Sequence, residues 1–206
     1  MIHIFGGGTV NHVRNHLAIC APAYGNTARQ IYEKLDNYGV IPVRLQLTKM
    51  ADYKSNMETN DDVAARLDEL IAYQSTKAIV FNVALCDFYG KIDDIEPGKY
   101  AERLKSRNGD VVMQLTPANK LLSKIKKLRP DIILVGFKTT ADAGLEDQLQ
   151  LCRRQIAETD VDMVFANDTV TRRNILVCNS VETYGSREDV IDYMVSRLVK
   201  LYDTVA

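Results

Sequence analysis

The stretch that most constrains this fold is an apolar run that begins at Ala78 and breaks at Asp87 into a carboxylate, two aromatics and a glycine. A continuous run of Ile, Val, Phe and Ala that is too short for an ordinary helix is typical of a strand buried on both faces, as in parallel sheets. Ligands of open α/β sheets bind just outside the carboxyl ends of such strands. Asp87 is therefore a candidate ligand-facing residue, and the alternative is that it only caps the following turn.

The rest of the chain alternates between strand patterns and helix patterns. Strands are expected at residues 2–5, 40–47, from 78 to the break at 87, 111–115, 130–138, 161–168 and 174–178, and helices at 25–39, 60–71, 117–128, 145–158 and from 186 onward. This order predicts an α/β domain with a mainly parallel sheet and right-handed crossovers. One core can serve a chain of up to roughly 250 residues, so a single domain over residues 1–206 is expected.

Composition excludes several classes of partner. A formal charge of −1 gives no electrostatic reason to expect nucleic acid or an anionic membrane. No apolar run approaches the about 20 residues that span a bilayer, and the start of the chain resembles a strand more than a signal peptide. The four cysteines are scattered without a zinc spacing, which is typical of reduced thiols in a cytoplasmic protein. His12 and His16 lack the helical pattern and acidic partner of a metal site, so no protein-held metal is expected.

The first strand ends in a glycine run, Gly6 to Gly8, where the backbone can approach a ligand closely. The run lacks the spacing of a dinucleotide site, and no P-loop is present, so the two commonest nucleotide motifs are not supported. The next helix begins after Gly25, with Asn26 as a possible cap. A helix start of this kind is a natural site for an anion, which makes phosphate binding plausible.

Three of the expected strands end in polar or aromatic residues. They deliver Asn82 with Asp87, Phe137 with Lys138, and Asn167 with Asp168. Carboxyl ends of parallel strands meet at one edge of a sheet, so we expect these side chains to converge. This convergence predicts the site better than any single residue does.

Residues 91–109 form a long, charged excursion with no core periodicity, and with the following strand they make a flap of about residues 91–115. Long excursions in compact domains are commonly functional lids or disordered segments. Its basic residues are either a solvated face or a set of cations that closes over an anionic ligand. Lys99, Arg103, Lys105 and Arg107 are the candidates for the second interpretation.

Several short motifs follow one another in a recognisable order. They are Gly7-Gly8-Thr9 with Val13-Arg14, the run from Asn82 to Tyr89, Lys120-Leu121-Leu122 after the basic flap, Val135 to Lys138, and Phe165 to Asp168. With these motifs the chain resembles the phosphopantothenoylcysteine synthetase family, the ligase domain of the DNA/pantothenate metabolism flavoproteins, over essentially its whole length. The resemblance implies a Rossmann-like, three-layer domain that forms a homodimer. It also implies an enzyme of coenzyme A biosynthesis that activates the carboxylate of 4′-phosphopantothenate with CTP or ATP and Mg²⁺, and then couples it to cysteine.

The resemblance also assigns roles by position. The loop from Ala18 to Gly25 would cradle phosphates, and Phe137 would pack on the base. The implied substrate and phosphate ligands are Arg14, Cys20, Ala21, Gly25 and Asn26. The implied nucleotide ligands are Gly7, Gly8, Phe81, Asn82, Val83, Asp87, Gly136, Phe137, Lys138, Asn167 and Asp168. For Phe137 the alternative is an ordinary core position.

Two departures from the family pattern fall on chemistry. Ala18 stands where the family has an asparagine that stabilises the acyl intermediate, and Arg103 and Lys105 stand in a flap whose lysine pattern is altered. These three positions are therefore the catalytic candidates, and the rival hypothesis is a non-catalytic relative that only binds nucleotide or phosphopantothenate. A generic oxidoreductase is disfavoured because the acidic ribose-binding residue of that class has no clear candidate.

Overall fold

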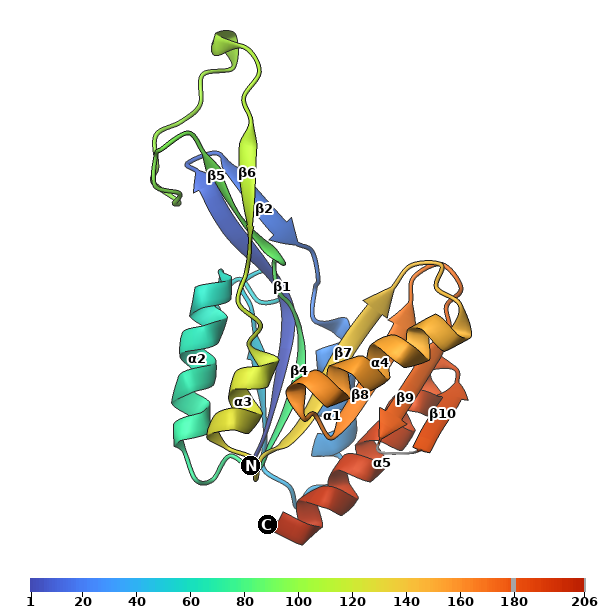
Figure 1. The fold of residues 1–206 in the computed structure, drawn as a ribbon. Coiled ribbons are helices and arrows are strands. Elements are labelled where there is room, and N and C mark those ends of the chain that lie inside the picture. Colours follow the sequence, from blue (N-terminus) through green and yellow to red (C-terminus); the bar gives the residue numbers. More distant parts are fainter. Residues whose placement is uncertain (179–180, 206) are drawn as a thin grey trace.

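The computed structural model describes residues 1–178 and 181–205 and consists of one sheet between two helical layers (Figure 1). The parallel strands lie in the order β3 (Val43–Leu47), β1 (Ile2–Arg14), β4 (Ala78–Ala84), β7 (Ile133–Thr140) and β8 (Met163–Asp168). Beyond β8, β9 (Asn174–Cys178) runs antiparallel to β8, and β10 (Val181–Gly185) runs antiparallel to β9. The predicted α/β fold with a mainly parallel sheet is confirmed.

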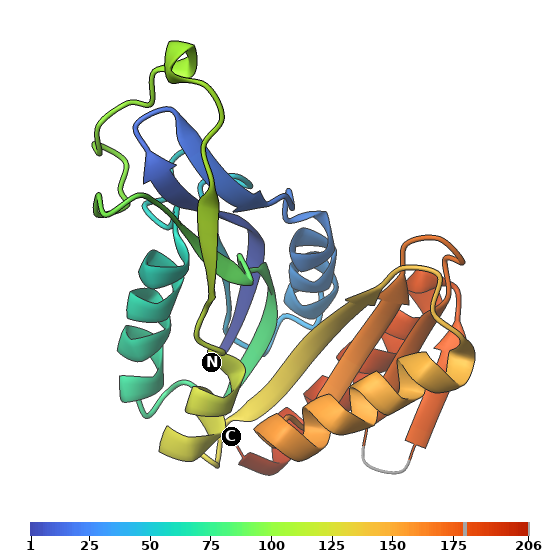
Figure 2. The same ribbon diagram turned by 45° about the horizontal axis from the view of Figure 1, so that its top comes forward.

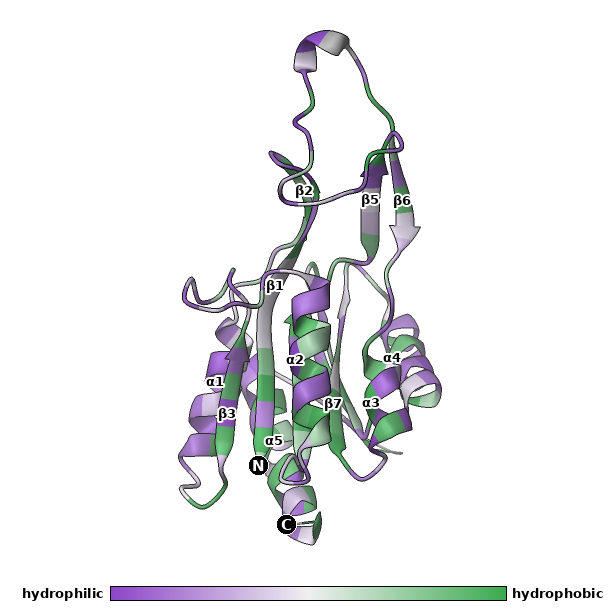
Figure 3. Cartoon of the chain, turned by 90° about the vertical axis from the view of Figure 1, so that its left-hand side faces the viewer, coloured by the Kyte–Doolittle hydropathy of each residue, from purple (hydrophilic) through white to green (hydrophobic). Residues whose placement is uncertain are grey.

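Each face of the sheet has its own core. Helices α1 (Asn26–Asp36) and α5 (Arg187–Val205) cover one face, and α2 (Asn60–Ala72), α3 (Leu122–Leu128) and α4 (Leu145–Thr159) cover the other. Helix α2 covers its face because its buried residues Val63, Leu67, Leu70 and Ile71 recur at helical spacing, and Figure 3 shows hydrophilic and hydrophobic residues alternating along its ribbon. Its start is fixed by a capping box in which the Thr59 hydroxyl accepts from the Asp62 amide and the Asp62 carboxylate accepts from the Thr59 amide.

The connections make a switch point in the sheet. The chain leaves β1 for β3 through α1 on one face, and it returns from β3 to β4 through α2 on the other face. The carboxyl ends of β1 and β4 therefore flank the position at which ligands bind in open α/β sheets.

Two antiparallel pairs extend beyond the sheet and form what we call the arm, residues 9–21 and 88–117. The second half of β1 pairs with β2 (Leu17–Ala21), and β5 (Phe88–Ile92) pairs with β6 (Met113–Pro117). In Figures 1 and 2 the arm rises from the β1 side of the molecule and carries the short helix η1 (Ser106–Asn108) at its far end.

The two pairs pack tightly against each other at Gly90. A Cβ atom there would lie 2.8 Å from Ile19 Cδ1 and 2.9 Å from Val13 Cγ2, so any larger residue would require these side chains to shift. Arg14 is fully buried beside it, and its guanidinium donates to the carbonyls of Ile92 and Ile95. The structure gives Arg14 this role within the arm in place of the predicted contact with a phosphate.

Several expected boundaries are wrong, and most of them adjoin the arm. The segment from Ala18 to Gly25 is not one loop, because Ala18 lies in strand β2 opposite His12. The helix expected from Pro117 begins at Leu122, and Pro117 instead ends β6 opposite Phe88. Strand β4 ends at Ala84, β3 begins at Val43 rather than residue 40, and β5 and β10 were not predicted as separate strands. The pairings of β2 with β1 and of β5 with β6 depend on contacts within the arm that local patterns do not encode, whereas β10 pairs with the neighbouring strand β9.

Candidate functional site

The carboxyl ends of β4, β7 and β8 meet at one edge, as expected, but their side chains divide between the two faces of the sheet. Asn82, Phe137 and Asn167 follow core residues of the α1/α5 face at two-residue spacing. The predicted nucleotide ligands Phe81, Val83, Gly136, Lys138 and Asp168 point to the α2/α4 face. The first group and the second group therefore cannot line the same side of one ligand.

Three residues of the second group have structural roles that account for their identity. Phe81 is 5% exposed, and its ring packs against Phe5 with centroids 5.5 Å apart. Gly136 leaves room for the Gln155 side chain of α4, which its Cβ would strike. These contacts leave only the backbone of Phe81 and Gly136 for a ligand.

Asp168 is the third such residue, since it is 2% exposed and organises two loops. Its carboxylate accepts hydrogen bonds from the Thr140 hydroxyl and from the amides of Asp142, Ala143, Val170 and Thr171. Burial alone raises the pKa of this carboxyl, but the hydrogen bonds from Thr171, Ala143, Thr140 and Val170 outweigh burial and lower the pKa far below its usual range. The structure uses Asp168 to hold the loops after β7 and β8, in place of the predicted contact with a nucleotide.

On the α1/α5 face an aromatic platform lies at the edge of the sheet. The half-buried Phe137 ring packs on Phe165 at a centroid distance of 5.4 Å, and the Arg187 guanidinium lies 5.4 Å from the centroid of Phe165. Arg187 also donates to the Thr27 hydroxyl at 2.6 Å. Phe137 therefore belongs in part to the core, and its remaining exposed part is open to a ligand.

The start of α1 lies next to this platform. Gly25 is the N-cap in a left-handed conformation with φ 75°, and no side chain caps the first turn. The predicted capping by Asn26 is wrong, because Asn26 is already the first helical residue. The preceding chain crosses β1 so closely that a Cβ on Gly8 would strike the Ala21 carbonyl oxygen. The absence of a side chain at Gly8 thus makes room for the loop that leads into α1, and binding of a ligand to Gly7 and Gly8 stays a prediction.

Asp87 lies in the link between β4 and β5, three residues beyond the strand end. Its carboxylate is 71% exposed and forms an ion pair with Lys120 at 2.7 Å. The link itself is fixed by the neighbouring Cys86, whose amide donates to Asn60 Oδ1 and to the Thr9 hydroxyl at 3.0 Å each. Asp87 is thus an accessible charged group on a rigid support.

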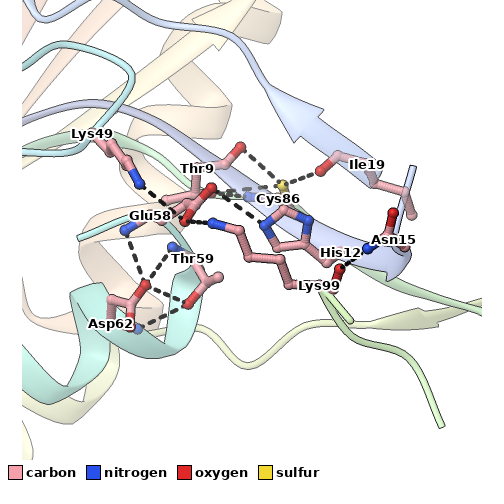
Figure 4. Close-up of polar contacts among 10 residues, drawn as sticks. All are labelled: Thr9, His12, Asn15, Ile19, Lys49, Glu58, Thr59, Asp62, Cys86 and Lys99. Carbon is pink, nitrogen blue, oxygen red and sulfur yellow. Dashed lines mark hydrogen bonds and ion pairs between the residues drawn. The ribbon is translucent and has the colours of Figure 1, made fainter. Parts of the chain in front are cut away.

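Glu58 joins three elements at the base of the arm (Figure 4). Its carboxylate lies 2.7 Å from Lys99 of the flap, 3.6 Å from Lys49 after β3, and 3.3 Å from His12 Nε2 of β1. The hydrogen bond from Lys99 lowers the pKa of Glu58. Lys99 is therefore engaged in holding the flap to the body.

The remaining predicted residues do not reach the edge of the sheet. Arg103 and Lys105 line a shallow depression near η1, at the far end of the arm (Figures 1 and 2). Ala18, Cys20 and Ala21 belong to β2, and of these Ala21 is the one next to the loop that leads into α1. Among the described residues there is no cluster of three or more His, Cys, Asp and Glu side chains suited to a metal ion.

Two residues at the edge were missed as site residues. Arg187 and Thr27 are 160 positions apart, so no local pattern connects them.

Within residues 1–178 and 181–205 no helix is long and apolar enough to cross a membrane.

Comparisons with known proteins identify the family of the chain. The model of the DNA/pantothenate metabolism flavoprotein C-terminal domain family matches residues 40–187. The chain belongs to this family. The match covers all the helices and strands from β3 to β10 and reaches the first residue of α5.

Curated and solved relatives agree with the family. A coenzyme A biosynthesis bifunctional protein CoaBC of Thermococcus kodakarensis is 22% identical over 152 residues, which cover 74% of this chain and 33% of that protein. This chain therefore spans about a third of that relative's length. The DNA/pantothenate metabolism flavoprotein of Streptococcus pneumoniae has the same fold, with a TM-score of 0.83 at 19% identity over 97% of this chain and 98% of that chain. A Cab2 variant in complex with phosphopantothenate-cysteine has a TM-score of 0.68 at 13% identity over 98% and 86% of the two chains.

Proposed function

We propose that this chain is a ligase of coenzyme A biosynthesis that joins 4′-phosphopantothenate to cysteine at the expense of a nucleoside triphosphate. The observation that carries the proposal is the family membership over residues 40–187. The names of its relatives support the proposal, since one acts in coenzyme A biosynthesis and another was solved with phosphopantothenate-cysteine.

The chemistry asks mainly for positive charge at the edge of the sheet. Attack of a carboxylate on a nucleotide phosphate brings negative charges together. Hydrogen-bond donors that are already in place lower the free energy of this transition state. Cationic side chains available there are Lys120 beside Asp87, Lys138 at the end of β7, and Arg187 beside the start of α1. The exposed part of Phe137 would receive the base of CTP or ATP.

Mg²⁺ would enter with the nucleotide. This ion is commonly held by one or two carboxylates together with substrate phosphates. Asp87 fits that role because its carboxylate is exposed at the edge, whereas the Asp168 carboxylate is fully occupied by its own loops. The ion would neutralise phosphate charge, and Asp87 would orient it.

A homodimer formed through the arm is part of the proposal. Every residue of β6 is exposed, and the apolar Val112 and Leu115 are 87% and 49% exposed. A two-stranded ribbon with a free apolar edge favours pairing with another chain. We expect a cytoplasmic enzyme, with no nucleic acid or membrane as partner.

The rival function is a relative that binds the ligands without turnover, and the position of Ala18 favours it. Ala18 has no side-chain donor for an acyl intermediate, and it lies in β2 of the arm rather than in the loop before α1. Removing one donor from an oxyanion site costs about 10²–10³ in rate in enzymes where this was measured.

One assay separates the two functions. Pyrophosphate release is measured with CTP and with ATP, each with phosphopantothenate alone and with phosphopantothenate plus cysteine, and the amide is identified by mass spectrometry. The ligase is expected to release pyrophosphate in a single turnover with phosphopantothenate alone, as the acyl-nucleotide forms, and to release it continuously with amide formation only when cysteine is also present. Tight binding of both ligands with no pyrophosphate released from either nucleotide would refute the ligase and establish the rival.

A further inference from the structure

Arg187 is a half-buried cation without a counter-charge. No carboxylate of residues 1–178 and 181–205 lies within ion-pair distance of its guanidinium, whereas Arg153 and Arg129 are both paired with acids. Burial lowers the pKa of Arg187, which reflects the cost of keeping this charge away from water. A cation held at such a cost without an acid is suited to receive an anion.

The guanidinium is fixed in place by neutral groups. It donates to the Thr27 hydroxyl at 2.6 Å and lies over the Phe165 ring at 5.4 Å, while Asn174 Oδ1 is at the limit of a hydrogen bond at 3.5 Å. A guanidinium carries five N–H donors in one plane, so further donors remain for a ligand. The Thr27 hydroxyl accepts from Arg187 and keeps its own proton, so it too can donate to an anion.

The position of Arg187 ties it to the candidate site. Strand β10 runs parallel to β8, because both are antiparallel to β9, so its end at Gly185 lies at the carboxyl edge. Phe165, beneath the guanidinium, also supports Phe137. Arg187 therefore lies on the same face and at the same edge as Asn82 and Asn167.

We propose that Arg187, supported by Thr27, binds a phosphate group of one substrate of the reaction proposed above, on which this inference rests. Planar donors of arginine match the oxygens of a phosphate in a two-pronged contact, and the Thr27 hydroxyl adds a donor from the side. Two sources carry this chemistry, the phosphate ester of phosphopantothenate and the phosphates of the nucleotide.

Binding measurements by titration calorimetry distinguish the sources. The ligands are 4′-phosphopantothenate, pantothenate without its phosphate, and CTP or ATP. Arg187→Ala is expected to weaken binding of one phosphate-bearing ligand at least tenfold and to leave pantothenate binding unchanged. Loss of phosphopantothenate affinity assigns the ester phosphate, and loss of nucleotide affinity assigns the nucleotide.

Controls separate binding from a purely structural link between α5 and α1. Arg154→Ala removes an exposed arginine that is paired with Glu158 on α4, and it should alter neither ligand's affinity. Arg187→Lys keeps the charge and should restore part of the affinity, whereas Arg187→Gln keeps the stem and should not. If Arg187→Ala does not fold, the ligand affinities of Arg187→Lys and Arg187→Gln are compared instead.

Failure of this inference and failure of the proposed function give different results. Ligation by the wild type with unchanged affinities and KM values in folded Arg187→Ala and Arg187→Gln would overturn the role of Arg187 alone. Binding that depends on Arg187, without pyrophosphate release, would overturn the ligase alone. A wild type that binds neither ligand would overturn both.

Discussion

Replacing Glu58 with glutamine should loosen the flap without disturbing the sheet. The carboxylate holds Lys99 of the flap at 2.7 Å, with Lys49 at 3.6 Å and His12 at 3.3 Å (Figure 4). Glutamine preserves the length of the side chain and one acceptor but removes the negative charge. The flap then keeps its backbone contact, in which the Asn15 amide donates to the Ala101 carbonyl at 3.0 Å.

The size of the effect follows from exposure. The Glu58 side chain is 25% exposed and the Lys99 side chain 43%, so the pair lies between the surface and buried limits. Exposed ion pairs contribute about 0.2–1 kcal/mol. Hydrogen bonds to charged groups contribute about 1.5–3 kcal/mol. We expect a loss of about 1–2 kcal/mol, which raises the population of the open flap by roughly 5- to 30-fold.

Hydrogen exchange of single amides measures this opening directly. The Asn15 and Ala101 amides should exchange faster in Glu58→Gln by that factor at neutral pH and low salt, and amides of β4 should not change. Glu69→Gln is the matched control, because Glu69 pairs with Arg66 on α2 and does not touch the flap. Equal exchange of Asn15 in the wild type and in Glu58→Gln would refute the reasoning.

The same pair predicts a pH dependence with a defined sign. Lys99 lowers the native pKa of Glu58, so the unfolded or opened state takes up a proton first as the pH falls. The stabilisation is fully present above the unfolded pKa of about 4.3 and is lost as the pH falls through the lowered native value. The difference in amide exchange between the wild type and Glu58→Gln should therefore disappear at acidic pH.

Three further predictions concern the edge of the sheet. Gly8→Ala should lower Tm sharply, because its Cβ would strike backbone atoms, whereas Gly98→Ala should be nearly neutral since nothing lies within 4 Å of the new atom. Asp168→Asn should lower Tm at neutral pH, because it weakens the hydrogen bonds that hold the two loops. The native pKa of Asp168 is lowered, so the difference in Tm between the variant and the wild type should become smaller below the unfolded pKa of about 3.9. Asp87→Asn should keep the wild-type Tm, since the carboxylate is 71% exposed, but weaken Mg-nucleotide binding in a fluorescence titration; unchanged nucleotide affinity would remove it from the site.

The sequence by itself was sufficient for the parallel part of the sheet and for the family. The run from Ala78 and the 3.6-residue periodicity of the segments that became α2 and α5 follow from burial, which each residue expresses locally. The order of strands and helices then required a parallel sheet with the ends of β4, β7 and β8 at one edge. Short motifs along these strand ends were specific enough to indicate the family.

Only the tertiary structure decided the role of each polar residue. In the sequence, Arg14 is a charged residue in a predicted loop, and Asp168 and Arg187 are charged residues near the ends of a predicted strand and a predicted helix. The fold buries Arg14 among carbonyls and Asp168 among amides, and it leaves Arg187 beside Thr27 without an acid. The partners of Arg14 and Arg187 come from chain segments 81 and 160 residues away. Local periodicity specifies which face of an element is buried, but the groups that satisfy a buried charge are set by packing between distant segments.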